Sequence, residues 1–210
     1  ISIIRQKLNS VNIWPSREQV NAFMPPAIHK TFPTCRVIID CTELYVEQPS
    51  NPTHQQSSFS YYKNHNTYKS LIGIALSGGV SFISDLWLGS ISDKEITMNS
   101  GILDKLEAGE TVLADRGFTV LENEFVRRDV TLFTAFFFQD KIQFPIDKRC
   151  ENKKVSSHRC HVERAIGRIK SFKILDGIIS WNLKNIDDIH YICAFLTNFS
   201  EIPLINVIKC

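Results

Sequence analysis

Apolar and polar positions alternate along the chain with two periods, and these periods predict both strands and helices. Residues 36–46, "RVIIDCTELYV", have the pattern of a buried apolar strand, which a single carboxylate, Asp40, interrupts. The segments "YKSLIGIALS" and "VSFISDLWLG" flank Gly78-Gly79, which predicts two further strands joined by a hairpin. Apolar runs at 112–114 and 130–138 predict two more strands, because both are far shorter than the roughly 20 residues of a membrane span.

Helical patterns surround these strands. Residues 1–31 are mostly helical in pattern, and Ser16 with Gln19 three residues later is typical of a capping box. Ser92 is the expected N-cap of a helix before the strand at 112–114. A short helix is expected over 121–128.

The two clearest helices lie near the end of the chain. In "SSHRCHVERAIGRIKSFKIL", residues 156–175, apolar side chains recur at helical spacing on one face. They are Val162, Ala165, Ile166, Ile169 and Phe172. The other helix is expected over 185–199, whereas the polar stretches at 47–60 and 139–155 are expected to be loops.

This order of elements predicts an α/β fold. An antiparallel three-stranded start, extended by crossovers through helices, implies a mixed sheet of about five strands with helices on both faces. We expect a helical lead-in at 1–31, a main domain at 32–200 and a tail at 201–210. Because the chain begins with Ile1 inside a helical pattern, we expect it to be a fragment.

Charge is distributed unevenly, although the formal net charge is only +2. Residues 85–124 carry nine acids and three bases, whereas residues 148–173 carry nine bases and two acids. An acidic segment that could hold cations and a basic segment that could hold phosphates would suit a polyanion substrate. Solvated helix faces would produce the same pattern.

Several classes of protein lack their usual markers in this sequence. The six cysteines show no disulfide-framework spacing, and no signal sequence opens the chain. We therefore expect reduced thiols, an intracellular setting and no membrane partner. No "GxxxxGK", "GxSxG" or "GxGxxG" motif points to nucleotide-driven or acyl-transfer chemistry. A zinc site is not favoured, because the spacing of its candidate ligands fits no common finger; these are Cys150, His158, Cys160 and His161.

Two predicted strands each lead to an aspartate, Asp40 in the first and Asp115 at the end of "TVLAD". Each could simply cap the turn that follows its strand. If the two strands are neighbours, however, the carboxylates meet, and Glu163 beside the apolar stripe of the 156–175 helix can join them. Three converging carboxylates repel one another, and divalent metals relieve that repulsion. Oxygen ligands select Mg²⁺ or Mn²⁺, and a pair of such ions can hydrolyse a phosphodiester.

At these residues the chain resembles a known family, the DDE endonuclease domain of Harbinger-type DNA transposases. The matching stretches are "VIIDCTE", "YYKNHNTYKSLIGI", "GSISDKEIT", "LADRGF" and "HVERAIGRIKSFKIL", spread over roughly residues 30–200. The resemblance implies an RNase H-like fold. It also implies that Asp40, Asp115 and Glu163 are the catalytic, metal-binding triad. Asp93 matches a further acid of the family and would have a supporting role near the metals, or would only provide a helix N-terminal charge.

Basic side chains near these motifs are candidates for DNA contact. They are Lys63, His65, Lys69, Arg164, Arg168, Lys170 and Lys173. The first three alternate with tyrosines, a combination that suits nucleic acid, and the others surround Glu163. A solvated surface is the alternative for both groups.

The sequence therefore predicts a metal-dependent DNA endonuclease or transposase domain that uses Mg²⁺ or Mn²⁺. A transposase-derived DNA-binding protein without catalysis, and an RNase H-like nuclease acting on RNA or hybrid, remain alternatives. No clear helix-turn-helix is present, so binding of DNA ends would need a separate partner or a missing N-terminal module. We also expect a nuclear location, and a homo-oligomer is compatible with the sequence.

Overall fold

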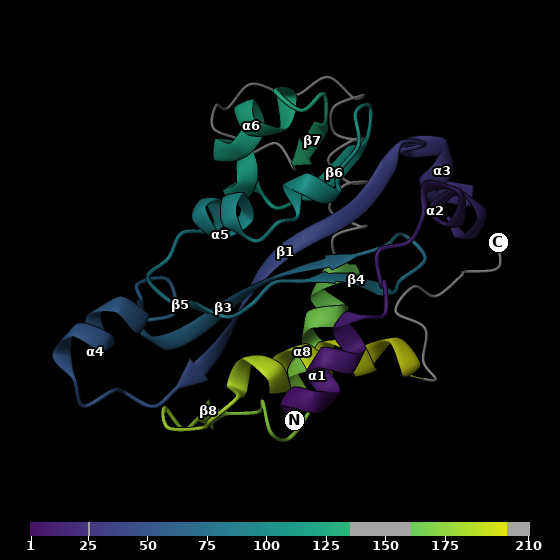
Figure 1. Ribbon diagram of the computed structural model, residues 1–210. Helices are drawn as coiled ribbons and strands as arrows, with labels where there is room; N and C mark the ends of the chain where they lie inside the picture. The colour runs from purple at the N-terminus through teal and green to yellow at the C-terminus, as the bar shows by residue number, and fades with distance from the viewer. Residues whose placement is uncertain (25, 135–160, 201–210) are drawn as a thin grey trace.

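The computed structural model describes residues 1–24, 26–134 and 161–200 (Figure 1). The helices and 3-10 turns are α1 (Ser2–Asn9), α2 (Arg17–Phe23), α3 (Pro26–Thr31), α4 (Pro52–Ser58), α5 (Asp93–Asn99), η1 (Leu103–Lys105), η2 (Arg116–Leu121), α6 (Glu122–Val126), a helix over 161–170, α8 (Ile186–Leu196) and η3 (Thr197–Phe199). The strands are β1 (Cys35–Val46), β2 (Phe59–Ser60), β3 (His65–Ile74), β4 (Val80–Ile83), β5 (Trp87–Leu88), β6 (Thr111–Ala114), β7 (Thr131–Thr134) and β8 (Ile178–Ile179).

The strands form one mixed sheet around β1. Its main path is β2-β3-β1-β6-β7, with β4 and β5 paired to β3 and β8 paired to β1. β1 runs antiparallel to β3 but parallel to β6 and β8, and β6 runs parallel to β7. The predicted α/β mixed sheet is therefore confirmed, and it is consistent with an RNase H-like fold.

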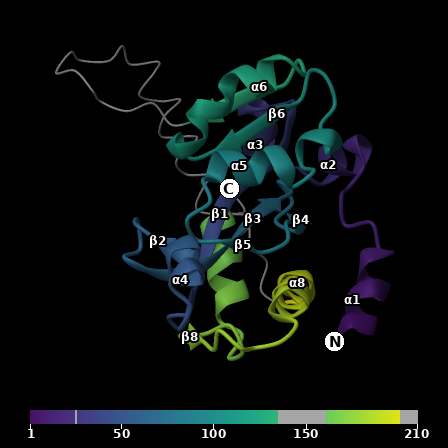
Figure 2. The same ribbon diagram turned by 60° about the vertical axis from the view of Figure 1, so that its left-hand side comes forward.

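Helices cover both faces of the sheet, as predicted. On one face the 161–170 helix and α8 pack on Ile38, Leu44 and Ile72. On the other face α5, η2 and α6 pack on Ile39 and Leu71. Figures 1 and 2 show these two groups of helices on opposite sides of β1 and β3. Successive residues of β1 thus belong to different clusters, as alternation along a strand requires.

The helix caps predicted from the sequence are present in the structure. Ser16 and Gln19 make both hydrogen bonds of a capping box at the start of α2. Ser92 accepts a hydrogen bond from the Glu95 amide and begins α5. This helix ends at Asn99, and Gly101 beyond it has a φ of +81°.

Other elements differ from the prediction. The hairpin between β3 and β4 forms, but its connection covers residues 75–79 rather than two glycines, with Gly78 at a φ of +98°. The predicted strand at 80–89 is divided into β4 and β5. The polar stretch at 47–60 contains α4, because the Asn51 side chain caps its first amides and Pro52 is favourable at a helix start.

Some predictions fall outside the described residues. These are the end of the predicted strand at 135–138, the loop at 139–155, the tail at 201–210 and three of the zinc candidates, Cys150, His158 and Cys160. Within the described ranges, no helix has both the length and the apolar character needed to cross a membrane.

Candidate carboxylate site

The four acids singled out in the sequence line one cavity of about 490 Å³. Asp40 lies in β1, Asp115 directly follows β6, Glu163 comes from the 161–170 helix and Asp93 from the start of α5. The remaining lining residues are Cys41, Thr42, Glu43, Tyr62, Lys63, Ile166 and Lys170. Segments that are distant in sequence therefore meet at this cavity, as the sequence predicted for the three acids.

The pairing of β1 with β6 brings Asp40 and Asp115 together. Ile39 of β1 pairs with Ala114 of β6, and each aspartate is the next residue along its strand. Strand alternation gives both aspartates the orientation of Ile38 and Leu113, whose side chains share the cluster that contains the 161–170 helix. Both carboxylates therefore face the helix that carries Glu163.

Each aspartate also accepts a hydrogen bond from the amide that follows it. The distance is 2.9 Å from the Cys41 amide to Asp40 Oδ1 and 2.5 Å from the Arg116 amide to Asp115 Oδ1. The capping role weighed from the sequence is real for Asp115, which is the N-cap of η2, but not for Asp40, because β1 continues beyond it to Val46. Asp115 both caps η2 and lines the cavity, so the two roles are compatible.

The 161–170 helix presents a second side to the cavity. Its buried residues Val162, Ala165 and Ile169 anchor it to the sheet. Glu163, Ile166 and Lys170, separated by three and four positions, line the cavity beside this anchor. The helix therefore supplies an acid and a base to the same space.

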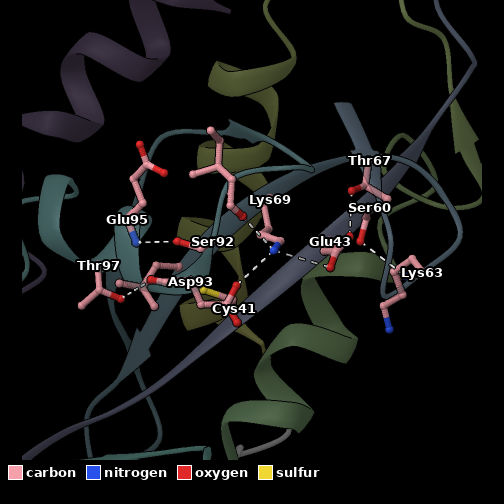
Figure 3. A network of polar contacts seen from close by, with 12 residues as sticks. Cys41, Glu43, Ser60, Lys63, Thr67, Lys69, Ser92, Asp93, Glu95 and Thr97 are labelled. Carbon is pink, nitrogen blue, oxygen red and sulfur yellow. Dashed lines mark hydrogen bonds and ion pairs between the residues drawn. The ribbon is translucent and has the colours of Figure 1, made fainter. Parts of the chain in front are cut away.

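Asp93 reaches the cavity from the other layer of the fold. It lies in the first turn of α5, and its Oδ1 accepts a hydrogen bond of 3.1 Å from Lys69 Nζ. The Cys41 thiol lies close by (Figure 3). Burial, and then the carboxylates of Asp93 and Asp40, raise the pKa of this thiol well above its usual value, so Cys41 is protonated at neutral pH.

The candidate DNA-contact residues occupy different environments. Lys63 and Lys170 line the cavity, and burial followed by the charge of Lys63 lowers the pKa of Lys170. Lys69 lies inside a polar network, whereas His65 lines a separate cavity and its ring packs on Tyr45. Arg164 and Lys173 are exposed and Arg168 is half-buried, and none of these three lines the carboxylate cavity. Their contact with DNA stays a prediction.

The donors around the cavity suit a hard divalent cation by their chemistry. These donors are the carboxylates and the hydroxyl of Thr42. Thr42 is 3% exposed, and its hydroxyl has no hydrogen-bond partner within the described part of the chain. Among the described residues, however, no three acidic, cysteine or histidine side chains are close enough to form a ready metal site. The residues thus fit Mg²⁺ or Mn²⁺, and their side chains would have to draw together to bind one.

Sequence reasoning missed two parts of this site. Thr42 and Glu43 lie two and three residues after Asp40, but the sequence did not mark them as site residues because the pairing of β1 was unknown. Tyr62 was noted only as a neighbour of Lys63, and it is 85% exposed at the cavity with Lys63 Nζ 4.6 Å from its ring centroid. The strand register, had it been predictable, would have revealed Glu43 opposite Lys69.

The fold and the cavity together define a class of protein. The mixed sheet is consistent with an RNase H-like fold, and its acids lie just beyond the paired part of two parallel strands and on a helix across them, which suits a nuclease domain. The chain matches the family model described as DDE superfamily endonuclease over residues 39–198, and it belongs to that family. No curated protein and no solved structure matches the chain.

Proposed function

We propose that this chain is a metal-dependent DNA endonuclease domain of a Harbinger-type transposase, or of a host protein derived from one. The observation that carries the proposal is the position of Asp40 and Asp115, each one residue beyond the last pair of the parallel strands β1 and β6, where both line one cavity with Glu163. Membership of the DDE endonuclease family supports nuclease chemistry at these acids. DNA as the substrate implies a nuclear location.

In the proposed mechanism, Asp40, Asp115 and Glu163 would hold two Mg²⁺ or Mn²⁺ ions, with Asp93 beside them. Bound metals would supply an activated water and a charge that stabilises the leaving oxygen of a phosphodiester. Lys63 and Lys170 at the cavity would orient the phosphate through its charge. In a full transposase, a DNA 3'-hydroxyl would then replace water as the nucleophile on target DNA.

The first test is to titrate Mn²⁺ and Mg²⁺ into the wild-type chain and into Asp115→Asn by calorimetry, with nicking of plasmid DNA followed in parallel. We expect Asp115→Asn to abolish nicking and to weaken Mn²⁺ binding roughly a hundredfold, because it removes a charged ligand. Asp104→Asn is the matched control, since Asp104 is exposed and does not line the cavity.

Three results would redirect the proposal. Absence of metal binding in the wild-type chain would contradict it. Metal binding without nicking would favour the alternative of a DNA-binding protein without catalysis, or the need for a partner or further module. Cleavage of an RNA–DNA hybrid but not of duplex DNA would favour an RNase H-like nuclease.

A further inference from the structure

Lys69 is a basic residue of the carboxylate site whose ammonium points into the protein. Its side chain is 12% exposed, and Nζ donates hydrogen bonds to the Ile91 carbonyl at 3.0 Å and to Asp93 Oδ1 at 3.1 Å. Glu43 Oε1 lies 3.9 Å from the same nitrogen. Figure 3 shows the ammonium between these two carboxylates, which belong to β1 and α5.

The sheet fixes this arrangement from the side of Glu43. Glu43 of β1 is the direct cross-strand partner of Lys69 in β3, so the two side chains share one face of the sheet. The Thr67 hydroxyl donates a 2.7 Å hydrogen bond to Glu43 Oε2, which holds the carboxylate in place. Lys69 is therefore anchored on a rigid pair of strands before it reaches Asp93.

The second oxygen of Asp93 faces the turn after Asp115. A Cβ atom placed on Gly117 would lie 3.9 Å from Asp93 Oδ2, and Gly117 is two residues beyond Asp115. One oxygen of Asp93 is thus held by Lys69 while the other borders the turn that carries a proposed metal ligand. The Asp93 carboxylate connects the buried ammonium to that turn.

We infer that Lys69 is a positioning residue of the endonuclease site, an inference that rests on the proposed function. Its ammonium fixes Asp93 through one oxygen and offsets one negative charge at the cavity. Asp93 is thereby kept at the rim of the site as an oriented, neutralised carboxylate beside the three proposed metal ligands, Asp40, Asp115 and Glu163. Lys69 thus reduces the net negative charge around the metals by one and keeps the metal ligands at a fixed spacing.

Lys63 shows how a lysine with a different role is placed. Its side chain is exposed, and its Nζ lies over the ring of Tyr62 rather than on a carboxylate. Such a side chain can move to bind a phosphate. Lys69 would first have to break its hydrogen bonds to Asp93 and Ile91. We therefore assign DNA contact to Lys63 and positioning to Lys69.

The test compares Lys69→Met with the wild-type chain in two measurements that should move in opposite directions. We expect the Mn²⁺ dissociation constant to fall about fivefold, because one positive charge beside the cations is lost at a screened distance of several ångströms. We expect nicking of plasmid DNA to slow by about ten- to a hundredfold, because the ligands lose their fixed spacing. A purely structural lysine would lower stability without tightening Mn²⁺ binding to the folded protein.

Three further variants separate charge from folding. Lys94→Met is the matched control, since Lys94 follows Asp93 on α5 but is exposed, and its Mn²⁺ affinity should be unchanged. Lys69→Met combined with Asp93→Asn restores the charge balance and should return the Mn²⁺ affinity to within about twofold of wild type. Lys69→Arg keeps the charge and should retain wild-type Mn²⁺ affinity, even if Lys69→Met fails to fold.

The outcomes distinguish this inference from the proposed function. Unchanged or weaker Mn²⁺ binding in folded Lys69→Met would overturn the positioning role, and so would tighter binding in Lys94→Met or Lys69→Arg. If the wild-type chain binds and nicks normally in those cases, the endonuclease proposal still stands. If the wild-type chain binds no Mn²⁺, the proposed function falls and the inference falls with it.

Discussion

Asp40 is a carboxylate within an otherwise apolar strand, and the sheet around it explains why it is tolerated. β6 accompanies β1 only as far as Ala114, opposite Ile39, and β8 joins the same edge only at Tyr45. Between these two partners β1 borders the cavity, so Asp40 is only half-buried. The partial exposure of Asp40 thereby reduces the desolvation cost of its carboxylate.

His190 on α8 is a second polar residue in an apolar setting. It is fully buried, and neither ring nitrogen has a hydrogen-bond partner within the described ranges. Burial, followed by the positive charges of Arg5 and Lys170, lowers the pKa of His190 to about 4. The folded chain therefore requires a neutral imidazole at this position.

This requirement predicts how stability depends on pH. In the unfolded chain His190 binds a proton once the pH falls below its ordinary pKa of about 6.5. In the folded chain it binds a proton only when the pH falls to about 4, so the free energy of unfolding decreases as the pH falls from 6.5 to 4. The loss attributable to His190 would be roughly 3 kcal/mol at 1.36 kcal/mol per pKa unit. Urea unfolding at pH 7 and 4.5 should show it, and His190→Leu should remove this part of the pH dependence. The exposed His54, changed to Gln, should leave the dependence intact.

At the scale of elements, the loop between β5 and α5 determines where Asp93 lies. Gly89 donates a 2.9 Å hydrogen bond from its amide to the Thr67 carbonyl of β3. A Cβ atom at Gly89 would overlap the Thr67 hydroxyl and lie 2.5 Å from the Ser58 carbonyl oxygen. The loop can pack this closely on β3 only because residue 89 has no side chain. The same packing brings the Ile91 carbonyl within hydrogen-bond distance of Lys69 Nζ.

We therefore expect Gly89→Ala to destabilise the protein by about 1–3 kcal/mol, because the extra methyl meets backbone atoms that cannot move away. Nicking should decrease as well, since Asp93 moves with the loop. Gly167→Ala is the matched control, and it should change the stability in the opposite direction. Gly167 lies in the 161–170 helix with nothing within 4 Å of an added Cβ, so alanine should stabilise by about 0.5–1 kcal/mol. Denaturant unfolding curves measure both, and equal effects would contradict the close-packing argument.

The elements that the sequence predicted best are those with a strong period or cap. β1, α5 and the 161–170 helix have long apolar patterns or a clear N-cap. The two helices form within their predicted ranges, and β1 begins one residue before its predicted range. The two-residue strands β2 and β8 could not be predicted, because they are too short to have a period and exist only through pairing with β3 and β1. The α4 helix was missed because its polar, proline-containing sequence is also that of a loop.

The same limit applies to the site. Asp40 and Asp115 could be found because each follows an apolar strand pattern, and Glu163 because it lies beside an apolar helical stripe. Lys69 was predicted as a DNA contact because the local sequence shows only its alternation with tyrosines. Its burial between Glu43 and Asp93 depends on the register of β1 with β3 and on the docking of α5, which no local pattern contains.

At the scale of the whole molecule, the carboxylate cavity is the meeting point of the two helical layers. Asp40, Asp115 and Glu163 belong to the side of the first cluster, whereas Lys69 and Asp93 come from the side of α5. Exposed Lys63, Arg164 and Lys173 provide positive charge on nearby elements. This positive charge would attract a polyanion toward the part of the molecule that holds the cavity.

This distribution predicts salt-dependent binding of duplex DNA. The logarithm of affinity should fall linearly with the logarithm of salt concentration, by about 0.9 for each phosphate contact. Lys63→Gln should reduce the slope by about one contact if Lys63 binds a phosphate. Lys7→Gln, an exposed change on α1 away from the cavity lining, should leave the slope unchanged. Fluorescence anisotropy at several salt concentrations gives both slopes, and an unaltered slope for Lys63→Gln would remove it from the interface.

The central position of β1 also has a consequence for folding. Its pairing with β3 joins neighbouring segments, but its pairing with β6 and β8 joins residues far apart in the sequence. Contacts between distant segments form slowly, because the chain must first close long loops. The β1–β3–β4 meander can therefore assemble before Asp115 and Glu163 arrive, and the ability to bind a metal ion would appear only when the last of these segments has docked.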